Sequence, residues 1–172
     1  MAFEDSFWDF SLAFYASPGI SKLLIDWQDA HGVDVNIVLC GCWLAARRNE
    51  LDRGQLQALI DAVEPWRRDV IEPVRSARRA VKAREELAAM PDAQALRQRL
   101  LDVELALERS VQQRLESLVE HQAPGHSDAS PSALLDGCLT LYSKTLDTTL
   151  ALSERETLVQ ALEALMSESA RD

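Results

Sequence analysis

The sequence has few of the residues that punctuate short strands, and it has no long hydrophobic run. Its 172 residues include only six glycines and six prolines, too few for the many turns of a β-rich fold. The longest nearly apolar run, residues 35–46, is well below the ~20 residues that a membrane span needs. The first residues also lack the basic segment and apolar stretch of a secretory signal. We therefore expect no β-rich fold, no membrane span and a cytoplasmic location.

Cysteine and positive charge are scarce as well. Cys40, Cys42 and Cys138 have neither a metal-ligand nor a CxxC spacing, so we expect reduced thiols. Eighteen Lys and Arg against 28 Asp and Glu give a net charge of −10, which opposes binding to nucleic acid. No Gly-rich phosphate loop, nucleophile elbow or HExxH motif is present. We expect no nucleic-acid partner, no metal and no cofactor, and we favour a non-enzyme while leaving an enzyme open.

What the chain does contain is helix-forming sequence. Ala, Leu, Arg, Glu and Gln dominate, and all are good helix formers. Residues 34–48 are apolar on almost every side, which is typical of a helix buried on all sides. Asn36 and Gly41 interrupt it, and we expect there a buried amide that needs partners or a close helix contact. We predict an all-α fold, a single-domain bundle of about seven to eight helices around a buried central helix at residues 34–48.

The aromatic residues gather at the N-terminus, after Ser6. At 100° per residue they form two apolar faces of one helix. The first face holds Phe7, Phe10 and Phe14, and the second holds Trp8, Leu12 and Tyr15. We predict that this helix packs on two sides. The alternative is that its aromatic residues line an apolar ligand pocket.

Prolines and caps predict where the next helices begin and end. Ser17-Pro18 is typical of a helix start, and Gly32 of the position after a helix end. Pro65 predicts the end of a helix that Asp52 caps. Pro73 lies inside the following helical pattern, so it should kink or split that helix.

The second half of the chain contains its longest predicted helix. At residues 92–121, Leu and Val recur every three or four positions, which predicts ~45 Å of helix and a surface for a homodimer. Residues 122–131 are rich in Pro, Gly and Ser and predict a loop. Residues 132–172 predict a helical pair that packs either on the main core or at its periphery, and we take residues 1–172 as one helical domain.

Basic residues concentrate in one stretch. Between residues 67 and 84, seven basic and two acidic residues give a local charge of +5, which leaves −15 for the rest. We define the basic face as Arg67, Arg68, Arg75, Arg78, Arg79 and Lys82. Clustered guanidinium groups suit phosphate, carboxylate or an acidic protein surface. The alternative is a solvated face that pairs with acidic helices of the same protein.

A second polar cluster lies near the predicted end of the helix before Gly32. It consists of Asp26, Asp29, His31 and Asp34. Carboxylates in a last helical turn oppose the helix dipole, so a cation site or an acid–base role for His31 is one hypothesis. The other is that Asp34 caps the next helix, His31 offsets the carboxylates, and Asp26 and Asp29 are solvated.

Several blocks of sequence carry a resemblance to a known family. They are Phe7-Trp8 with Tyr15-x-x-Pro18-Gly19, Leu24-x-x-Trp27-Gln28-Asp29-x-x-Gly32-x-Asp34-Val35-Asn36-x-x-Leu39-x-x-x-Trp43, and Trp66 with Arg75-x-x-Arg78-Arg79-x-x-Lys82. Over roughly residues 3–120 the chain resembles an uncharacterised family of small proteobacterial proteins, defined only as a domain of unknown function. The resemblance implies an all-helical fold in a bacterial cytoplasm and supplies no catalytic residues.

Two hypotheses for the function remain. The first is a non-enzymatic binding or adaptor protein that uses the basic face on an acidic body to hold a protein partner or a small anionic ligand. The second is a helical enzyme or small-molecule carrier with an aromatic pocket, whose rim of Arg75, Arg78, Arg79 and Lys82 holds an anionic head group. The first predicts a basic face on a flat or convex surface, whereas the second needs that face to rim a concave pocket.

Overall fold

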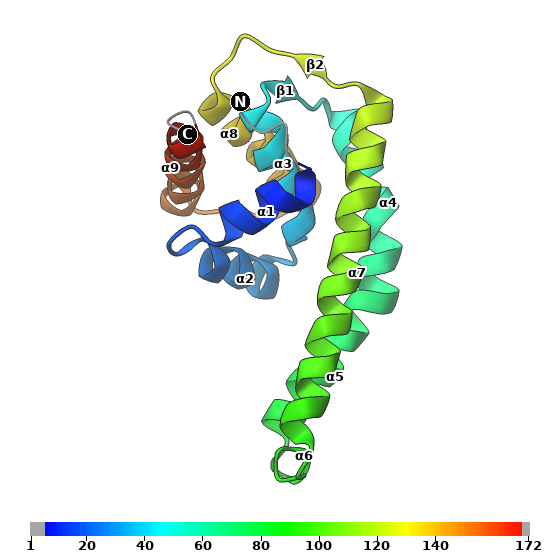
Figure 1. The fold of residues 1–172 in the computed structure, drawn as a ribbon. Coiled ribbons are helices and arrows are strands. Elements are labelled where there is room, and N and C mark those ends of the chain that lie inside the picture. The colour runs from blue at the N-terminus through cyan, green and yellow to red at the C-terminus, as the bar shows by residue number, and fades with distance from the viewer. Residues whose placement is uncertain (1–5, 170–172) are drawn as a thin grey trace.

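The protein is an all-α helical bundle, as the sequence predicts. The computed structural model describes residues 6–169. In chain order the elements are α1 (Phe7–Tyr15), α2 (Ile20–His31), α3 (Val35–Ala46), β1 (Asn49–Glu50), α4 (Arg53–Trp66), the π-helix η1 (Arg67–Ile71), α5 (Glu72–Ala83), α6 (Glu85–Ala88), α7 (Ala93–Gln122), β2 (Gly125–His126), α8 (Pro131–Thr145) and α9 (Leu152–Ser169) (Figure 1). None of the helices in this described part is both long and apolar enough to cross a membrane.

Helix α3 is the buried centre of the bundle, which confirms the prediction for residues 34–48. Every residue from Asn36 to Ala46 is buried. The Asp34 side chain accepts a hydrogen bond from the Asn36 backbone N–H at 2.8 Å and so caps the helix. A Cβ at Gly41 would lie 2.8 Å from Cys138 Sγ of α8. This glycine therefore allows α3 and α8 to approach closely, as expected.

Helix α1 buries one of its two apolar faces and leaves the other open. Phe7, Phe10 and Phe14 are at most 1% exposed and belong to the core. On the second face, Leu12 is 53% exposed. The prediction that the helix packs on two sides is therefore wrong at Leu12, where α2 and α7 leave a groove, although Tyr15 on the same face packs partly against the core.

The start of α2 also differs from the prediction. The helix begins at Ile20 rather than at Pro18, because Gly19 adopts a left-handed conformation with φ of 80°. A residue in that conformation cannot continue a right-handed helix from Pro18. At the other end, Gly32 is the left-handed cap that the sequence predicts.

The two prolines of the α4–α5 region act differently from each other. Pro65 is the next-to-last residue of α4, and the helical backbone continues past it into η1, so the α geometry ends near Pro65 without the predicted break. Apolar residues of α4 before that point, Leu59 and Val63 among them, are buried, and this packing offsets one lost hydrogen bond. Pro73 follows the π-helix, in which the Glu72 N–H bonds the carbonyl of Arg67, five residues earlier. The hydrogen-bond pattern thus changes from π to α just before Pro73 while the helical backbone continues, and the predicted helix is interrupted at Arg84, which has extended backbone.

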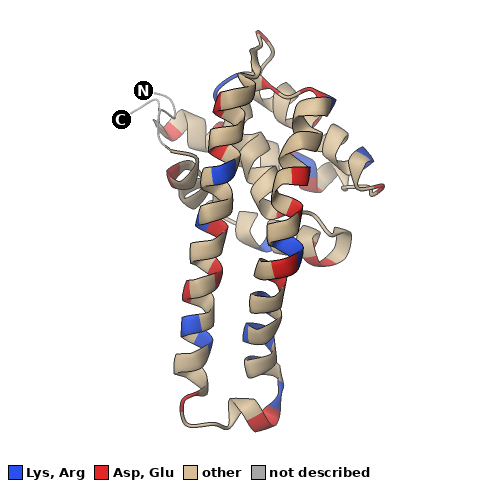
Figure 2. Ribbon diagram, turned by 90° about the vertical axis from the view of Figure 1, so that its right-hand side faces the viewer, with Lys and Arg blue, Asp and Glu red and all other residues tan. Residues whose placement is uncertain are grey.

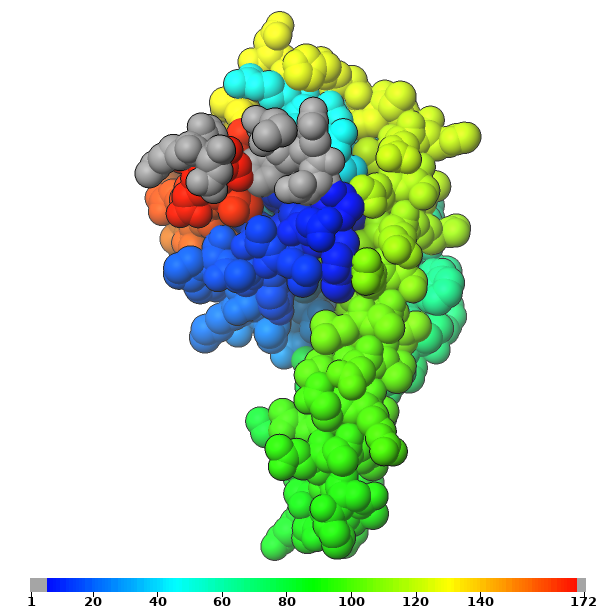
Figure 3. Space-filling model, viewed as in Figure 1, coloured from blue at the N-terminus to red at the C-terminus, as the bar shows by residue number. Residues whose placement is uncertain are grey.

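Helices α5 and α7 form a hairpin whose far end projects beyond the rest of the molecule (Figures 1 and 3). Acidic and basic residues interleave along both of its helices (Figure 2). At the near end, β1 and β2 form a two-residue antiparallel pair, and β2 lies within residues 122–131, which were predicted as a loop. The C-terminal pair packs on α3 and its neighbours, with its buried leucines in the same core cluster: Leu134, Leu135, Leu139, Leu158 and Leu162.

Candidate functional site

Two adjoining hollows lie where α1, α2 and α3 face the α5–α7 hairpin. The polar pocket has a volume of about 270 Å³ and is lined by α2, the 32–36 segment, η1, α5 and Glu108 of α7. The apolar groove has a volume of about 480 Å³ and is lined by α1, α2, α3, α5 and α7. Both hollows share one set of wall residues: Gln28, Val35, Asn36, Arg75, Arg79 and Glu108. They are therefore two sides of one site.

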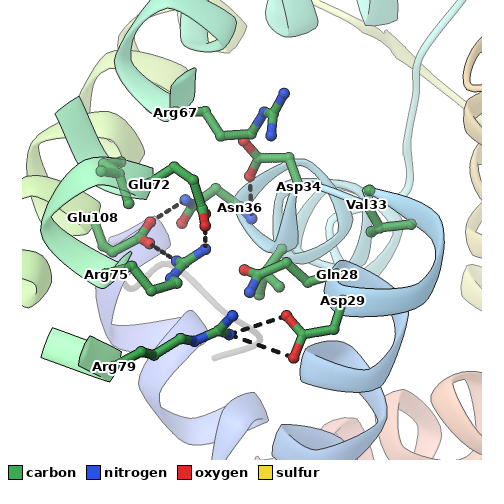
Figure 4. A pocket seen from close by; sticks show the side chains of 13 residues that line it. Gln28, Asp29, Val33, Asp34, Asn36, Arg67, Glu72, Arg75, Arg79 and Glu108 are labelled. Carbon is green, nitrogen blue, oxygen red and sulfur yellow. Dashed lines mark hydrogen bonds and ion pairs between the residues drawn. The ribbon is translucent and has the colours of Figure 1, made fainter. Parts of the chain in front are cut away.

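Arg75 is the centre of the wall between the two hollows. It is only 9% exposed, although it carries a full charge. Its guanidinium donates to Glu104 at 3.0 Å, to Glu108 at 2.8 Å and to Glu72 at 3.3 Å (Figure 4 shows the last two). Burial acts against the charged guanidinium, but these carboxylates outweigh it and raise the pKa of Arg75 above its ordinary value. A buried cation of this kind is stable only because its donors are filled.

The two carboxylates that bind Arg75 from α7 have opposite environments. Burial would raise the pKa of Glu104, but hydrogen bonds from Arg78 and Arg75 hold it below the ordinary value of 4.5. Arg78 contributes bonds of 2.6 and 3.2 Å. At Glu108, burial prevails and raises the pKa. The site therefore combines a firmly ionised carboxylate with one that is costly to ionise.

A chain of side-chain amides continues from Glu108 into the groove. The Asn36 amide donates to Glu108, and the Gln112 amide donates to Asn36 Oδ1 at 3.0 Å. Gln112 and Ser11 are both at least 96% buried and both line the apolar groove. Gln112 Oε1 and Ser11 Oγ, which are almost fully buried atoms, have no hydrogen-bond partner among the described residues. Buried polar atoms are nearly always paired, so these two atoms are exceptions to the usual pattern.

The basic face is largely paired within the protein. Each of its five arginines forms a salt bridge with a carboxylate of the same chain. The bond between Arg79 and Asp29, at 3.0 Å, joins α5 to α2 beside the polar pocket (Figure 4). That hydrogen bond lowers the pKa of Asp29. Lys82 is exposed and has no salt bridge within the described residues. The geometry thus agrees with a face that pairs with acidic residues of its own protein, and it also places Arg75, Arg78 and Arg79 in a concave region.

The predicted polar cluster does not form one group. Asp26 pairs with Lys22, whereas Asp29 pairs with Arg79. His31 Nδ1 lies 3.0 Å from Thr148 Oγ1.

Asp34 serves the fold of α3 rather than joining those side chains. It caps α3, and its backbone N–H donates to the Tyr142 hydroxyl at 2.9 Å. Burial raises the pKa of the Asp34 carboxyl. Among the described residues no group of three or more His, Cys, Asp or Glu side chains is placed to hold a metal ion.

The three cysteine thiols are poorly suited to acid–base chemistry at neutral pH. Cys40 and Cys42 are fully buried on α3, and burial raises the pKa of both. Burial raises the pKa of Cys138 to about 12. All three are therefore protonated at neutral pH and behave as small apolar side chains.

The sequence reasoning missed the α7 half of the site. Glu104, Glu108 and Gln112 lie within the helix predicted at residues 92–121, but that prediction used only the Leu and Val positions. Their spacing of four residues places them on one helix face, and that face continues into the buried Leu115. The sequence feature that indicates them is a row of polar residues on the same helix face as buried Leu and Val residues.

Comparison with known proteins gives a family and no function. No curated protein and no solved structure matches the chain significantly. A family described as "Protein of unknown function (DUF2390)" matches residues 6–115. This stretch is more than half of the chain and includes every residue that lines the polar pocket and the apolar groove. The chain therefore belongs to this family of unknown function.

Proposed function

We propose that this chain is a binding protein that holds a small molecule with an apolar body in the apolar groove. The observation that carries the proposal is the open second face of α1. Trp8, Leu12 and Tyr15 all line the groove, Leu12 is 53% exposed, and Trp8 and Tyr15 are only partly buried. A helix with two apolar faces normally buries both, so the uncovered face calls for another apolar group.

The opposite walls of the groove support the same proposal. Ile25 of α2 is 42% exposed and Leu105 of α7 is 49% exposed, and both line the groove with Leu12. The volume of about 480 Å³ lies within the range of roughly 300–1,000 Å³ that is usual for small-molecule sites. Three elements therefore direct exposed apolar side chains toward one space of suitable size.

The arrangement of the basic face favours a carrier over an adaptor. An adaptor that uses this face needs guanidinium groups with free donors on an open surface. Arg75 and Arg78 instead turn into the groove and bind Glu104. Gln28, Asp29, Gly32, Asp34, Val35 and Asn36, which lie within the stretch that the family model matches, line the polar pocket beside the groove. The carrier proposal accounts for both observations.

A dye-binding experiment tests the proposal. We expect the neutral dye Nile red to bind the purified protein and to fluoresce, because the groove offers it an apolar surface. Leu12→Asp should abolish this signal, since a carboxylate in the groove is costly to desolvate. Leu152→Asp is the matched control, because Leu152 is 66% exposed and lies on α9, outside the groove. A lack of dye binding, or equal loss in both variants, contradicts the proposal.

A separate observation favours self-association as a second function. Leu96 and Val103 of α7 are 40% and 48% exposed. They are seven residues apart, so they lie on one face of the helix, in the projecting part of the hairpin. A second copy of the chain could cover this face with the same residues, in the homodimer that the long helix predicts.

A further inference from the structure

The salt bridge between Arg79 and Asp29 lies at the rim of the two hollows. We infer that this pair is a latch, which holds α2 against α5 and so controls how fast a ligand enters and leaves the apolar groove. The inference rests on the proposed function and adds to it the regulation of the same site by ionic strength.

The exposure of the arginines along α5 places Arg79 at the rim. Arg75 and Arg79 are four residues apart, so they lie on one face of the helix. The side chain of Arg75 is 11% exposed, whereas that of Arg79 is 47% exposed. Both residues line the polar pocket and the apolar groove. Arg75 therefore lies at the base of the wall between the two hollows, and Arg79 lies where this wall reaches the solvent.

The latch spans the gap between α2 and α5. Arg79 Nη2 donates to Asp29 Oδ1 at 3.0 Å and to Asp29 Oδ2 at 3.4 Å (Figure 4). Among the residues that the structure describes, no other hydrogen bond or salt bridge joins these two helices. Loss of the latch therefore leaves α2 and α5 without a polar bond across the site.

The other polar bonds of the two helices hold them to different neighbours. On α2, the Trp27 indole N–H donates to Glu154 of α9 at 2.8 Å. On α5, the Arg75 guanidinium binds Glu104 of α7. Separation of α2 from α5 breaks neither of these bonds. Such a separation widens both hollows, because residues of both helices line each of them.

The latch is weak enough to open, and salt weakens it further. Both of its side chains are about half exposed, so the pair contributes little free energy and is screened by dissolved ions. The buried ion pairs of Arg75 are screened much less. An exposed pair of this kind shifts an opening equilibrium by at most about fivefold. The latch therefore changes the rate of ligand exchange and leaves the ion pairs at the base of the wall in place.

Stopped-flow fluorescence with Nile red tests the latch. The dye is neutral, so salt does not screen its approach to the protein. In Arg79→Met we expect the association and dissociation rates to rise together by about two- to fivefold, because entry and exit both need the open site. The dissociation constant should stay nearly unchanged. At about 1 M NaCl, where the Debye length is about 3 Å, the parent protein should reach the rates of the variant. A rise in the dissociation rate alone would show a direct contact between Arg79 and the dye and would overturn the inference.

Further variants separate the latch from a general loss of charge. Lys22→Met is the matched control, because it breaks the exposed salt bridge to Asp26 on α2, outside both hollows. Its rates should equal those of the parent protein. Asp29→Asn should act like Arg79→Met, and the double variant should be no faster than either single variant. Dye binding at the parent rates in both latch variants, or an equal rise in Lys22→Met, overturns the inference and leaves the proposed function intact.

A distance measurement tests the latch without a ligand. Spin labels at Ala30→Cys of α2 and Ala83→Cys of α5, both at exposed positions, report the separation of the two helices. Cys138→Ala removes the one native cysteine that is not fully buried. Arg79→Met, and high salt in the parent protein, should extend the distances to longer values. Unchanged distances overturn the inference. Longer distances without any binding of Nile red support the opening of the latch and refute the proposed function.

Discussion

Replacement of Arg75 by Met is the sharpest test of how this site is held together. Met fills a similar length of apolar space and removes the charge and all three ion pairs. Glu104 keeps Arg78 as its partner. Among the described residues, the hydrogen bond from Asn36 is then the only one left to Glu108. The cost therefore falls mainly on Glu108, whose side chain is 18% exposed.

The size of this effect follows from the burial of the groups. A buried pair that loses one partner typically loses about 3–5 kcal/mol of stability. Because the pKa of Glu108 is already raised, protonation of this carboxyl limits the loss, so we expect the lower end of the range. For a chain of this size, about 3–5 kcal/mol corresponds to a fall in Tm of roughly 6–20 °C. Adding Glu108→Gln to Arg75→Met should restore at least about 1 kcal/mol, because the uncompensated charge is gone.

Urea unfolding followed by circular dichroism measures these differences, with Arg79→Met as the matched control. Arg79 is on the same helix and pairs with Asp29, but both side chains are about half exposed. Exposed pairs contribute at most about 1 kcal/mol, so this variant should be nearly as stable as the parent. Equal stability of Arg75→Met and Arg79→Met would refute the reasoning, and so would a lack of rescue by Glu108→Gln.

Three further predictions concern pH, helix packing and assembly. The pKa of Glu104 is lowered in the folded protein, so its ionised carboxylate stabilises the fold above pH 4.5, the ordinary pKa, and this stability is lost as the pH falls through the folded pKa. In Glu104→Gln the free energy of unfolding should therefore decrease less on acidification. The pKa of Glu108 is raised in the folded protein, so its contribution to stability falls as the pH rises above 4.5, and this fall should be smaller in Glu108→Gln. Urea titrations from about pH 3 to 7 measure the effects of both variants. Stability profiles identical to that of the parent protein would contradict both predictions. Gly41→Ala should lower the free energy of unfolding by about 1–3 kcal/mol, because the added methyl group presses on Cys138. Adding Cys138→Ala should recover part of this loss in a double-mutant cycle, and additive effects of the two substitutions would rule out the contact. Val103→Glu should remove any concentration-dependent mass in sedimentation, and a parent protein that stays monomeric at tens of micromolar would end the dimer hypothesis.

The helices and their buried faces could largely be predicted from the sequence. The apolar content of residues 34–48 determined that α3 is central, and Gly41 marked its close contact with α8. Such features depend on local periodicity, which the chain carries in itself. The exact ends at Gly19 and Pro65 were mispredicted, because a left-handed turn and packing on neighbouring helices overrode the local preference.

The candidate site was predicted only in part. The sequence pointed to Arg75 and Asn36, but their partners Glu104 and Glu108 are separated from them by 29 to 72 residues. Which carboxylate meets which guanidinium depends on the angle and register at which α5 and α7 pack, and no local pattern encodes these.

The composition of the sequence therefore predicted the fold class correctly. The shortage of glycine, proline and long apolar runs determined an all-α protein in which no described helix is fit to cross a membrane, because helix propensity and apolar length are properties of single segments. Only the tertiary structure decided that one face of α1 stays uncovered and that the basic face is neutralised by the protein's own acids. Both outcomes are set by contacts between helices, and the free energy of such contacts depends on all the surfaces that meet.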